Sequence, residues 1–249
     1  MGFPIFCGRR GGAPADQKKA RVNYSERYVA KLLRRWGFTP QKPAFRAYEQ
    51  SPRALRQWLE RDYPAIRRRA AQQGAAVLWL DEVGMRSQHQ AGTTYAAKGK
   101  TPVLPRTGKR FSVHMISAIS NRGQLVFMVV DAPFNAVVFI RFLQKLLRSV
   151  RRKVFLIADR HPVHGERKVE QWLQEHKARI AFFPLPTYSP EINPDEYFNQ
   201  DLKTNGVGKA RPTNKQELKT LAERFANGKK KNPEKLKKYF HPNEVAYAR

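Results

Sequence analysis

Five short apolar runs constrain the fold of this chain more than any other feature. They are rich in β-branched and aromatic residues, are bounded by turn-forming residues, and cover residues 75–82, 110–120, 123–130, 153–161 and 179–186. Such runs predict strands. Helical patterns separate the last three of them, at residues 135–150 and 165–178. Three consecutive strands followed by alternating helices and strands predict an α/β fold, with antiparallel hairpins first and parallel crossovers after them.

The charge of the chain narrows the choice of partner. There are 48 lysines and arginines against 20 aspartates and glutamates, a formal net charge of +28, which favours a polyanion such as nucleic acid. No apolar run approaches the roughly 18 residues of a membrane-spanning helix, and the chain does not begin in the manner of a signal peptide. The single cysteine, Cys7, excludes an internal disulfide and a cysteine-based zinc cluster. We expect a cytoplasmic protein with no membrane association.

An amphipathic helix is predicted ahead of the strands, at residues 25–36. Ser25 and Gly37 suit its two ends. Its apolar positions recur at helical spacing and are Val29, Leu32, Leu33 and Trp36. The opposite face, called the basic face below, carries Arg27, Lys31, Arg34 and Arg35. This face suits the phosphate backbone or the major groove of double-stranded DNA, although an ordinary solvated surface has the same pattern. After a break at FTPQKP, a second helix is predicted from residue 51 to about 73.

Two aspartates directly follow apolar runs. Asp81 follows VLWL and Asp159 follows VFLIA. The carboxyl ends of strands form the ligand-binding edge of an open α/β sheet, so both side chains are candidates for one site. An aspartate after a strand also commonly does no more than open a turn.

A third acidic segment lies near residue 195. Asn193, Pro194 and Glu196 have the spacing of a helix start, with asparagine as the N-cap and glutamate completing a capping box. Glu196 therefore has a structural role available, and Asp195 would favour the positive end of the same helix. If the acidic segments converge, their oxygens suit Mg²⁺ or Mn²⁺, and a pair of such ions can activate a water or a 3′-hydroxyl in phosphodiester chemistry.

Three segments carry a family resemblance. Residues 77–103, 154–173 and 185–203 resemble the catalytic domain of transposases of the mariner superfamily, in its bacterial insertion-sequence branch. The most specific piece is SPEINPDE, where the family's third metal ligand stands two positions after the second proline. The resemblance implies a ribonuclease H-like catalytic domain, preceded by a partial helix-turn-helix region. It also implies a catalytic, metal-binding triad of Asp81, Asp159 and Glu196.

The function implied by the resemblance is that of a DNA transposase. Such an enzyme uses two Mg²⁺ or Mn²⁺ ions for strand cleavage and strand transfer of an insertion sequence. Its partners would be double-stranded DNA, as transposon ends and as target, and a second copy of the chain in an active homodimer. One alternative is a catalytically inactive remnant that only binds DNA. Another is a ribonuclease H-like nuclease, which would share the metal site but not the segment SPEINPDE.

Two pairs of residues are further candidates for DNA binding. His161 and His164 closely follow Asp159 and could contact DNA or orient a metal ligand, or be loop histidines with no chemical role. Lys98 and Lys100 belong to a predicted hairpin whose basic and aromatic groups suit a DNA backbone, unless it is simply solvated.

The neighbours of the proposed ligands are expected to stay outside the triad. Glu82 and Asp195 should point elsewhere, because adjacent residues of a strand or a helix face different directions. Arg160 departs from the family, in which the second aspartate is commonly followed by asparagine. Its side chain could turn outward or could weaken metal binding.

The patterns divide the chain into four predicted regions. Residues 1–22 are expected to be unstructured, and residues 23–73 to form a partial winged helix-turn-helix region with a linker helix. The catalytic domain would cover residues 74–210, and a basic helical tail residues 211–249. Members of the family usually have two helix-turn-helix units, and only the end of the second is recognisable here. We therefore expect a truncated copy with impaired recognition of its transposon ends.

Overall fold

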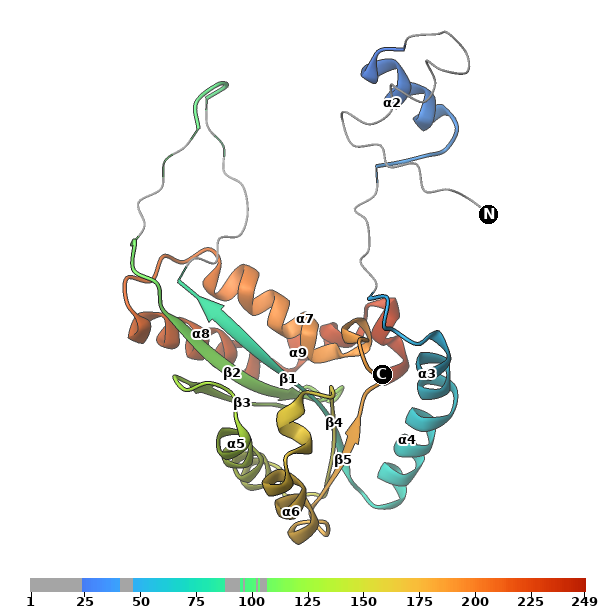
Figure 1. Cartoon of the computed structure of the whole chain (residues 1–249), viewed down its shortest axis with the longest axis vertical. Helices are drawn as coiled ribbons and strands as arrows, with labels where there is room; N and C mark the ends of the chain where they lie inside the picture. The colour runs from blue at the N-terminus through green and yellow to red at the C-terminus, as the bar shows by residue number, and fades with distance from the viewer. Residues whose placement is uncertain (1–23, 41–46, 88–94, 96, 102, 104–106) are drawn as a thin grey trace. The chain divides into compact units, whose positions relative to one another are not determined.

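A computed structural model describes residues 24–40, 47–87, 95, 97–101, 103 and 107–249 of the chain (Figure 1). The segment 1–22, expected to be unstructured, lies outside these residues. The chain divides into two compact units, residues 1–46 and 47–249, and each is described by itself.

The second unit is built on a five-stranded sheet. Its strands are β1 (Ala76–Arg86), β2 (Ser112–Ile119), β3 (Leu125–Val130), β4 (Val154–Ala158) and β5 (Ile180–Pro184), in the spatial order β3-β2-β1-β4-β5. The pairs β1–β2 and β2–β3 are antiparallel, whereas β4 is parallel to both β1 and β5. The predicted order of hairpins and crossovers is confirmed, and the mixed sheet with its flanking helices is ribonuclease H-like.

Helices cover both faces of this sheet (Figure 1). One face carries the two predicted crossover helices, α5 (Ala136–Ser149) and α6 (Arg167–Glu175). The other face carries α4 (Tyr63–Gln72), α7 (Pro194–Asp201), α8 (Lys215–Lys230) and α9 (Pro233–Lys237). The remaining short helices of this unit are α3 (Pro52–Gln57), η1 (Trp58–Asp62), η2 (Pro162–Gly165), η3 (Pro190–Ile192), η4 (Leu202–Val207), η5 (Lys238–Phe240) and η6 (Asn243–Ala248).

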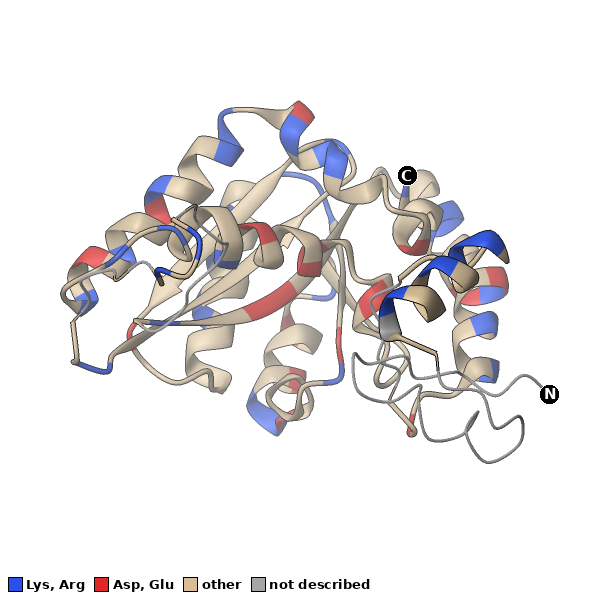
Figure 2. Cartoon of the chain, turned by 90° about the horizontal axis from the view of Figure 1, so that it is seen from above, with Lys and Arg blue, Asp and Glu red and all other residues tan. Residues whose placement is uncertain are grey.

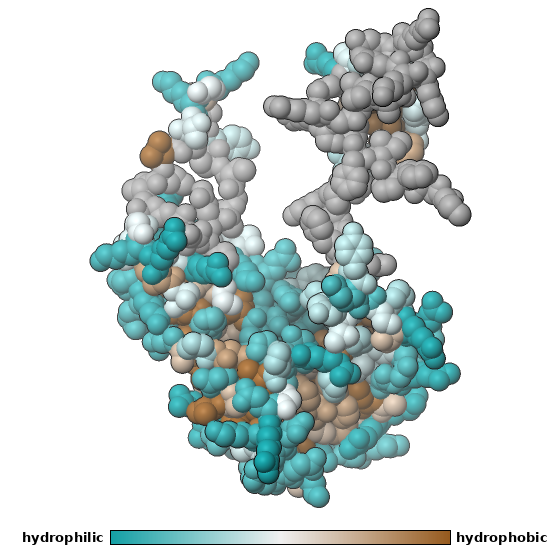
Figure 3. Space-filling model, viewed as in Figure 1, coloured by the Kyte–Doolittle hydropathy of each residue, from teal (hydrophilic) through white to brown (hydrophobic). Residues whose placement is uncertain are grey.

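Side-chain alternation along β1 separates the core into two layers. Trp79, Val83 and Met85 face the layer of α4, α7 and α8, whereas Leu78 and Leu80 face α5 and α6. Trp79 is completely buried. Because the apolar side chains lie between the layers, the surface in view is mainly hydrophilic (Figure 3). The same alternation places Asp81 toward the first layer and Glu82 toward the second.

The helix predicted from residue 51 to about 73 is continuous but not uniform. Ser51 caps it, and the π-helical segment η1 joins α3 to α4 just before Pro64. Proline has no N–H and its ring crowds the preceding turn, and a wider turn accommodates both effects. The helix packs against the sheet through Trp58 and Tyr63. It therefore belongs to the second unit, although the limits of the region 23–73 remain a prediction.

The C-terminal part of the chain also packs on the sheet. α8 buries Leu218, Ala222 and Ala226 against β2 and β3, and Phe240 lies against Trp79 with ring centroids 5.2 Å apart. The C-terminal region therefore has an apolar face within the core.

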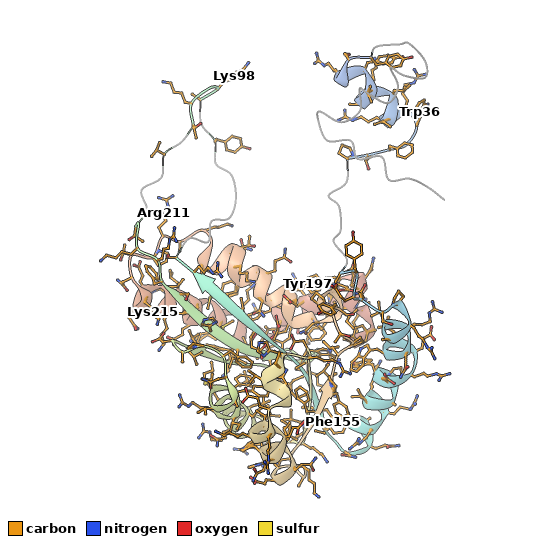
Figure 4. All side chains as sticks on the ribbon, in the orientation of Figure 1. Trp36, Lys98, Phe155, Tyr197, Arg211 and Lys215 are labelled. Atoms are coloured by element: carbon orange, nitrogen blue, oxygen red, sulfur yellow. The ribbon has the colours of Figure 1, made fainter. Side chains whose placement is uncertain are left out.

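The first unit contains the predicted amphipathic helix as α2 (Glu26–Arg35). The Ser25 hydroxyl accepts from the backbone N–H of Tyr28, and Gly37 ends the helix with a φ of 82° that suits glycine. Trp36 follows the last turn and is 64% exposed, so it does not complete the apolar stripe (Figure 4). Throughout the part of the chain that the structure describes, no helix is long and apolar enough to span a membrane.

Candidate active site

Asp81 lies in the middle of β1, so the prediction that it follows the strand is wrong. β1 continues to Arg86 because it pairs with β2 over this length, with Asp81 opposite Ser117. The pairing of β1 with β4 ends earlier, at Trp79 and Ile157. Asp81 therefore lies just beyond the point at which β1 and β4 separate.

The carboxyl group of Asp81 is buried beneath α7. The side-chain amide of Asn199 donates to its Oδ2 (2.8 Å). Burial raises the pKa of Asp81 well above its ordinary range. Three neighbouring carboxyl groups raise that pKa further, in the order Glu196, Asp195 and Glu82. Because these negative charges repel one another, a bound cation would be favoured here.

Asp159 follows β4 directly, as predicted, and its side chain is 52% exposed. Its Oδ1 accepts a hydrogen bond from the backbone N–H of His161 (3.0 Å), and Nδ1 of His164 lies 3.4 Å from the same oxygen. These contacts engage one oxygen of the carboxylate, so Oδ2 is the oxygen available to a further ligand.

Glu196 lies in the first turn of α7, which docks on β1 through its N-cap. Asn193 accepts from the N–H of Asp195 (3.1 Å) and donates from Nδ2 to the carbonyl of Leu80 (3.0 Å). The N–H of Asn193, which a capping box would pair with Glu196, donates instead to the carbonyl of Pro190 (2.9 Å). The capping-box arrangement is therefore not the one adopted, and the Glu196 carboxyl group is not needed to close the helix end.

Electrostatic interactions link Glu196 to Asp81 and to Asp159. Among the described residues, however, the triad is not a group whose ligand atoms all lie within 4.8 Å of one another. Burial raises the pKa of Glu196, Lys203 lowers it, and the charges of Asp159 and Glu82 raise it again. Glu196 in turn raises the pKa of Asp81. The three residues come from β1, the end of β4 and α7, and Figure 2 shows acidic segments on central strands and helices as well as on outer helices.

Asp195 points into the core, contrary to the expectation that it serves only the helix N-terminus. It is completely buried, and its Oδ2 accepts from the hydroxyl of Ser117 (2.7 Å). Its Oδ1 has no hydrogen-bond partner among the described residues. Burial raises the pKa of Asp195 well above its ordinary range. A carboxyl group outside the proposed triad is thus buried near Asp81.

A further cluster joins Glu82 to Asp159 through His164. Glu82 lies on the opposite face of β1 from Asp81, as expected, but Nε2 of His164 is 3.0 Å from its Oε1. Nδ1 of the same ring is 3.1 Å from the backbone oxygen of Asp159. Burial lowers the pKa of His164, but the two acidic partners outweigh this effect and the pKa is raised. One ligand atom from each of Glu82, Asp159 and His164 lies within 4.8 Å of the other two.

Residues 76–219 match the sequence pattern of the family described as DDE superfamily endonuclease. The match covers more than half of the chain. The chain belongs to this family. Residues 17–62 also match the pattern of a winged helix-turn helix, a region that contains α2.

Individual relatives agree with this assignment to the DDE family. A protein of Shigella sonnei, described as the insertion element IS630 uncharacterized 39 kDa protein, is 26% identical over 129 residues. The match covers 51% of this chain and only 37% of that protein. Among solved structures, the Mos1 transposase paired-end complex with left transposon end has a TM-score of 0.64 at 15% identity, covering 94% of this chain and 73% of that one. The Mos1 strand transfer complex has a TM-score of 0.61 at 17% identity, covering 94% and 72%. At these identities the structures support the fold alone.

The basic residues predicted to bind DNA are exposed in this DDE-family chain. All four side chains of the basic face of α2 are exposed. Lys98 and Lys100 lie on an exposed turn closed by a hydrogen bond from the Lys100 N–H to the Ala97 carbonyl (2.9 Å; Figure 4). The rest of the predicted hairpin lies largely outside the described residues.

The two histidines and Arg160 have more specific environments. His161 caps η2, because its Nδ1 accepts from the N–H of Val163 (3.2 Å). His164 is only 5% exposed, which favours a role in orienting Asp159 over a contact with DNA. Arg160 donates from Nε to the carbonyl of Leu185 (3.1 Å). Its side chain is thus held at the end of the adjacent strand β5.

Sequence reasoning missed Asn199 and Ser117, which donate hydrogen bonds to the carboxyl groups of Asp81 and Asp195 respectively. Asn199 lies one helical turn after Asp195 and Glu196 in α7, so helical spacing alone could have marked it. Ser117 could not be found this way, since its place opposite Asp81 depends on the register between β1 and β2.

Proposed function

We propose that this chain is a DNA transposase that cleaves and transfers DNA strands with two Mg²⁺ or Mn²⁺ ions held by Asp81, Asp159 and Glu196. The observation that carries the proposal is that Asp81 and Asp159 each lie two residues beyond the last β1–β4 pair, and that Glu196 interacts electrostatically with both. The match to the DDE superfamily endonuclease pattern supports the same reaction class.

The donor set fits hard divalent cations. All three proposed ligands are carboxylates, which Mg²⁺ and Mn²⁺ prefer over nitrogen or sulfur. Asn199 engages Oδ2 of Asp81 and the His161 N–H engages Oδ1 of Asp159, so each group has its other oxygen for a metal. Burial, and after it repulsion from neighbouring carboxyl groups, raises the pKa of Asp81, and bound cations would relieve that repulsion. Mos1 paired-end complexes have been crystallised with Mg and with Mn.

Bound ions would activate the attacking water or 3′-hydroxyl and stabilise the departing oxygen of the phosphodiester. The protein's contribution is positional. Asp81 is fixed by the sheet and by Asn199, and Asp159 by the backbone that follows β4. Glu196 is fixed because Asn193 ties the start of α7 to β1. Ligands held by separate rigid elements lose little conformational freedom when the site is loaded.

Double-stranded DNA is the proposed partner. The net charge of +28 and the exposed basic face of α2 favour binding to phosphates. Lys98 and Lys100 add exposed cations in the connection between β1 and β2. The Mos1 complexes contain paired transposon ends, and we extend to this chain the proposal that a homodimer is the active species.

Strand cleavage tests this function directly. The full chain is incubated with supercoiled DNA carrying the element's ends, with Mg²⁺, Mn²⁺ or a chelator. Nicking should require metal, and Asp81→Ala, Asp159→Ala and Glu196→Ala should each lower its rate at least about a thousandfold, roughly 4 kcal/mol of transition-state stabilisation. Glu234→Gln, which changes an exposed carboxylate on α9, is the matched control and should cleave normally. Metal-independent cleavage would contradict the proposal, and DNA binding without nicking under Mn²⁺ would favour a protein that only binds DNA.

A further inference from the structure

The cluster of Glu82, His164 and Asp159 has a geometry that the three proposed ligands do not explain. Nε2 of His164 faces the Glu82 carboxylate at 3.0 Å. Nδ1 faces the backbone oxygen of Asp159 at 3.1 Å and its Oδ1 at 3.4 Å. The ring therefore bridges β1 to the end of β4 at the place where these strands no longer pair.

This geometry argues against His164 as a metal ligand. A backbone carbonyl can only accept a hydrogen bond, so Nδ1 must carry the proton that it donates to Asp159. Nε2 faces a carboxylate, which is likewise an acceptor. A ring that donates from both nitrogens has no lone pair to offer to an ion. His164 consequently acts through Asp159 and Glu82, even though its ring nitrogens lie near enough to both to resemble a metal site.

The position of the ring is fixed by its surroundings. His164 is 5% exposed and contacts three phenylalanine rings, with ring centroids 4.6 Å from Phe139, 5.4 Å from Phe182 and 5.8 Å from Phe134. These rings come from α5, from β5 and from the residues just before α5. A polar ring surrounded by apolar groups has few alternative hydrogen-bond partners, so its two bonds are specified by the fold.

We propose that Glu82 and His164 form a positioning pair that orients Asp159 for metal binding. Glu82 holds the His164 ring through Nε2. Nδ1 of the ring and the backbone N–H of His161 both face Oδ1 of Asp159 and hold that oxygen in place. Oδ2 is thereby presented to the metal in a single orientation. The inference rests on the proposed function, since it assumes that Asp159 is a ligand. It adds two residues, neither of which touches the metal, that set how well this ligand binds.

Mn²⁺ affinity of the full chain, measured from the electron paramagnetic resonance signal of the free ion, tests the pair without relying on activity. His164→Phe preserves the aromatic packing but removes both N–H donors, and it should weaken Mn²⁺ binding about tenfold or more. Glu82→Gln keeps an acceptor for Nε2 but loses its charge, and it should weaken binding only about two- to fivefold. Asp159→Asn is the reference for loss of the ligand itself. His241→Ala, at an exposed histidine outside the cluster, should bind Mn²⁺ as the unaltered chain does.

A second pair of variants separates positioning from general disruption of the core. The side-chain amide of Asn overlies Nδ1 of histidine, whereas that of Gln overlies Nε2. His164→Asn should therefore retain more Mn²⁺ affinity than His164→Gln, because only the former can still donate toward Asp159. This comparison also decides the question if His164→Phe fails to fold.

Each contrary outcome is distinguishable. Equal affinities for His164→Asn, His164→Gln and the unaltered chain, with Asp159→Asn impaired, would overturn the positioning pair and leave the proposed function intact. Loss of binding in Glu82→Gln as severe as in Asp159→Asn, with His164→Phe unaffected, would make Glu82 a direct ligand and also overturn it. Failure of the unaltered chain to bind Mn²⁺, or normal binding by Asp159→Asn, would refute the proposed metal site and the inference with it.

Discussion

Replacing Asp201 with asparagine should destabilise the second unit substantially, although this carboxylate lies outside the proposed metal site. Asp201 is the last residue of α7, and its Oδ2 forms an ion pair with Lys229 of α8 and accepts from the hydroxyl of Tyr239 (2.5 Å). Its Oδ1 accepts from Asn205 (2.7 Å). One carboxylate thus ties the helix that carries Glu196 to α8 and η5.

The size of the effect follows from these contacts. The side chains of Asp201 and Lys229 are 19% and 18% exposed, so the pair is mostly shielded from water. Each charge-assisted hydrogen bond contributes about 1.5–3 kcal/mol. Asparagine can keep the bond from Asn205, but its NH2 group then replaces Oδ2 and cannot accept from Lys229 or Tyr239, while Lys229 can be partly rehydrated. We therefore expect a loss of about 2–3 kcal/mol in the free energy of unfolding, or roughly 5–10 °C in Tm for a chain of this length.

Urea unfolding followed by circular dichroism measures this loss. The matched control is Glu234→Gln, since Glu234 pairs with Lys237 at 2.7 Å but is 74% exposed, and an exposed pair contributes less than about 1 kcal/mol. An Asp201→Asn variant no less stable than this control would refute the reasoning.

A second check is the pH dependence of the difference in unfolding free energy between the unaltered chain and Asp201→Asn. Burial raises the pKa of Asp201, but the bonds from Lys229, Tyr239 and Asn205 lower it more, so it lies below its ordinary value. A lowered folded-state pKa means that the stabilisation is fully present above the unfolded-state pKa and is lost as pH falls through the folded-state value. The gap between the unaltered chain and Asp201→Asn should be equal at pH 7 and pH 5, and should narrow below about pH 4. A gap that does not change with pH would mean that the charge of Asp201 is not what stabilises the fold.

Three other perturbations have defined outcomes. Asn199→Ala removes the hydrogen bond on Oδ2 of Asp81 and should slow single-turnover nicking about 10- to 100-fold; an unchanged rate in a folded variant would contradict the supporting role. Gly123→Ala should destabilise the chain by about 2–4 kcal/mol in urea, because φ is +79° and a Cβ would lie 2.7 Å from the backbone oxygen of Pro233. Gly228→Ala, in α8 with nothing within 4 Å, is its control and should be neutral or stabilising by up to about 1 kcal/mol. Alanine at all four positions of the basic face of α2 should weaken the salt dependence of DNA binding, measured by fluorescence anisotropy. The slope of log affinity against log salt concentration should fall in magnitude by about 0.9 for each phosphate that the variant no longer neutralises. An unchanged slope would place DNA binding elsewhere.

Local signals account for the parts of the fold that could be predicted. The five strands, the crossover helices and the start of α2 at Ser25 follow from periodicity, turn residues and capping, all of which lie within a few residues of the element concerned. The start of α7 at Asn193 was predictable for the same reason. The extension of β1 past Asp81 was not, because it depends on pairing with β2, some thirty residues later in the chain.

The proposed metal ligands could be predicted from local sequence signals, whereas the residues that position them could not. The three carboxylates could be proposed because each occupies a recognisable segment. The burial of Asp195 against Ser117 and the bridge from Glu82 through His164 depend on how α7 and η2 dock on the sheet. A capping box at Glu196 was a reasonable prediction from spacing, but the preceding turn of η3 supplies Pro190 as the partner of the Asn193 N–H.

The separation of β1 from β4 after Trp79 has a consequence for how this fold can vary. Beyond Asp81, the strand keeps pairing with β2 from Glu82 opposite Ile116 to Arg86 opposite Ser112. This length of antiparallel ladder stands between Asp81 and the long connection at residues 87–111. The connection can therefore change in length or sequence without shifting Asp81, because the ladder isolates the aspartate from strain at the far end. An insertion in that connection should leave the spacing of the three carboxyl groups unaltered, so the exposed surface around Lys98 and Lys100 could diversify while the proposed metal ligands stay in place.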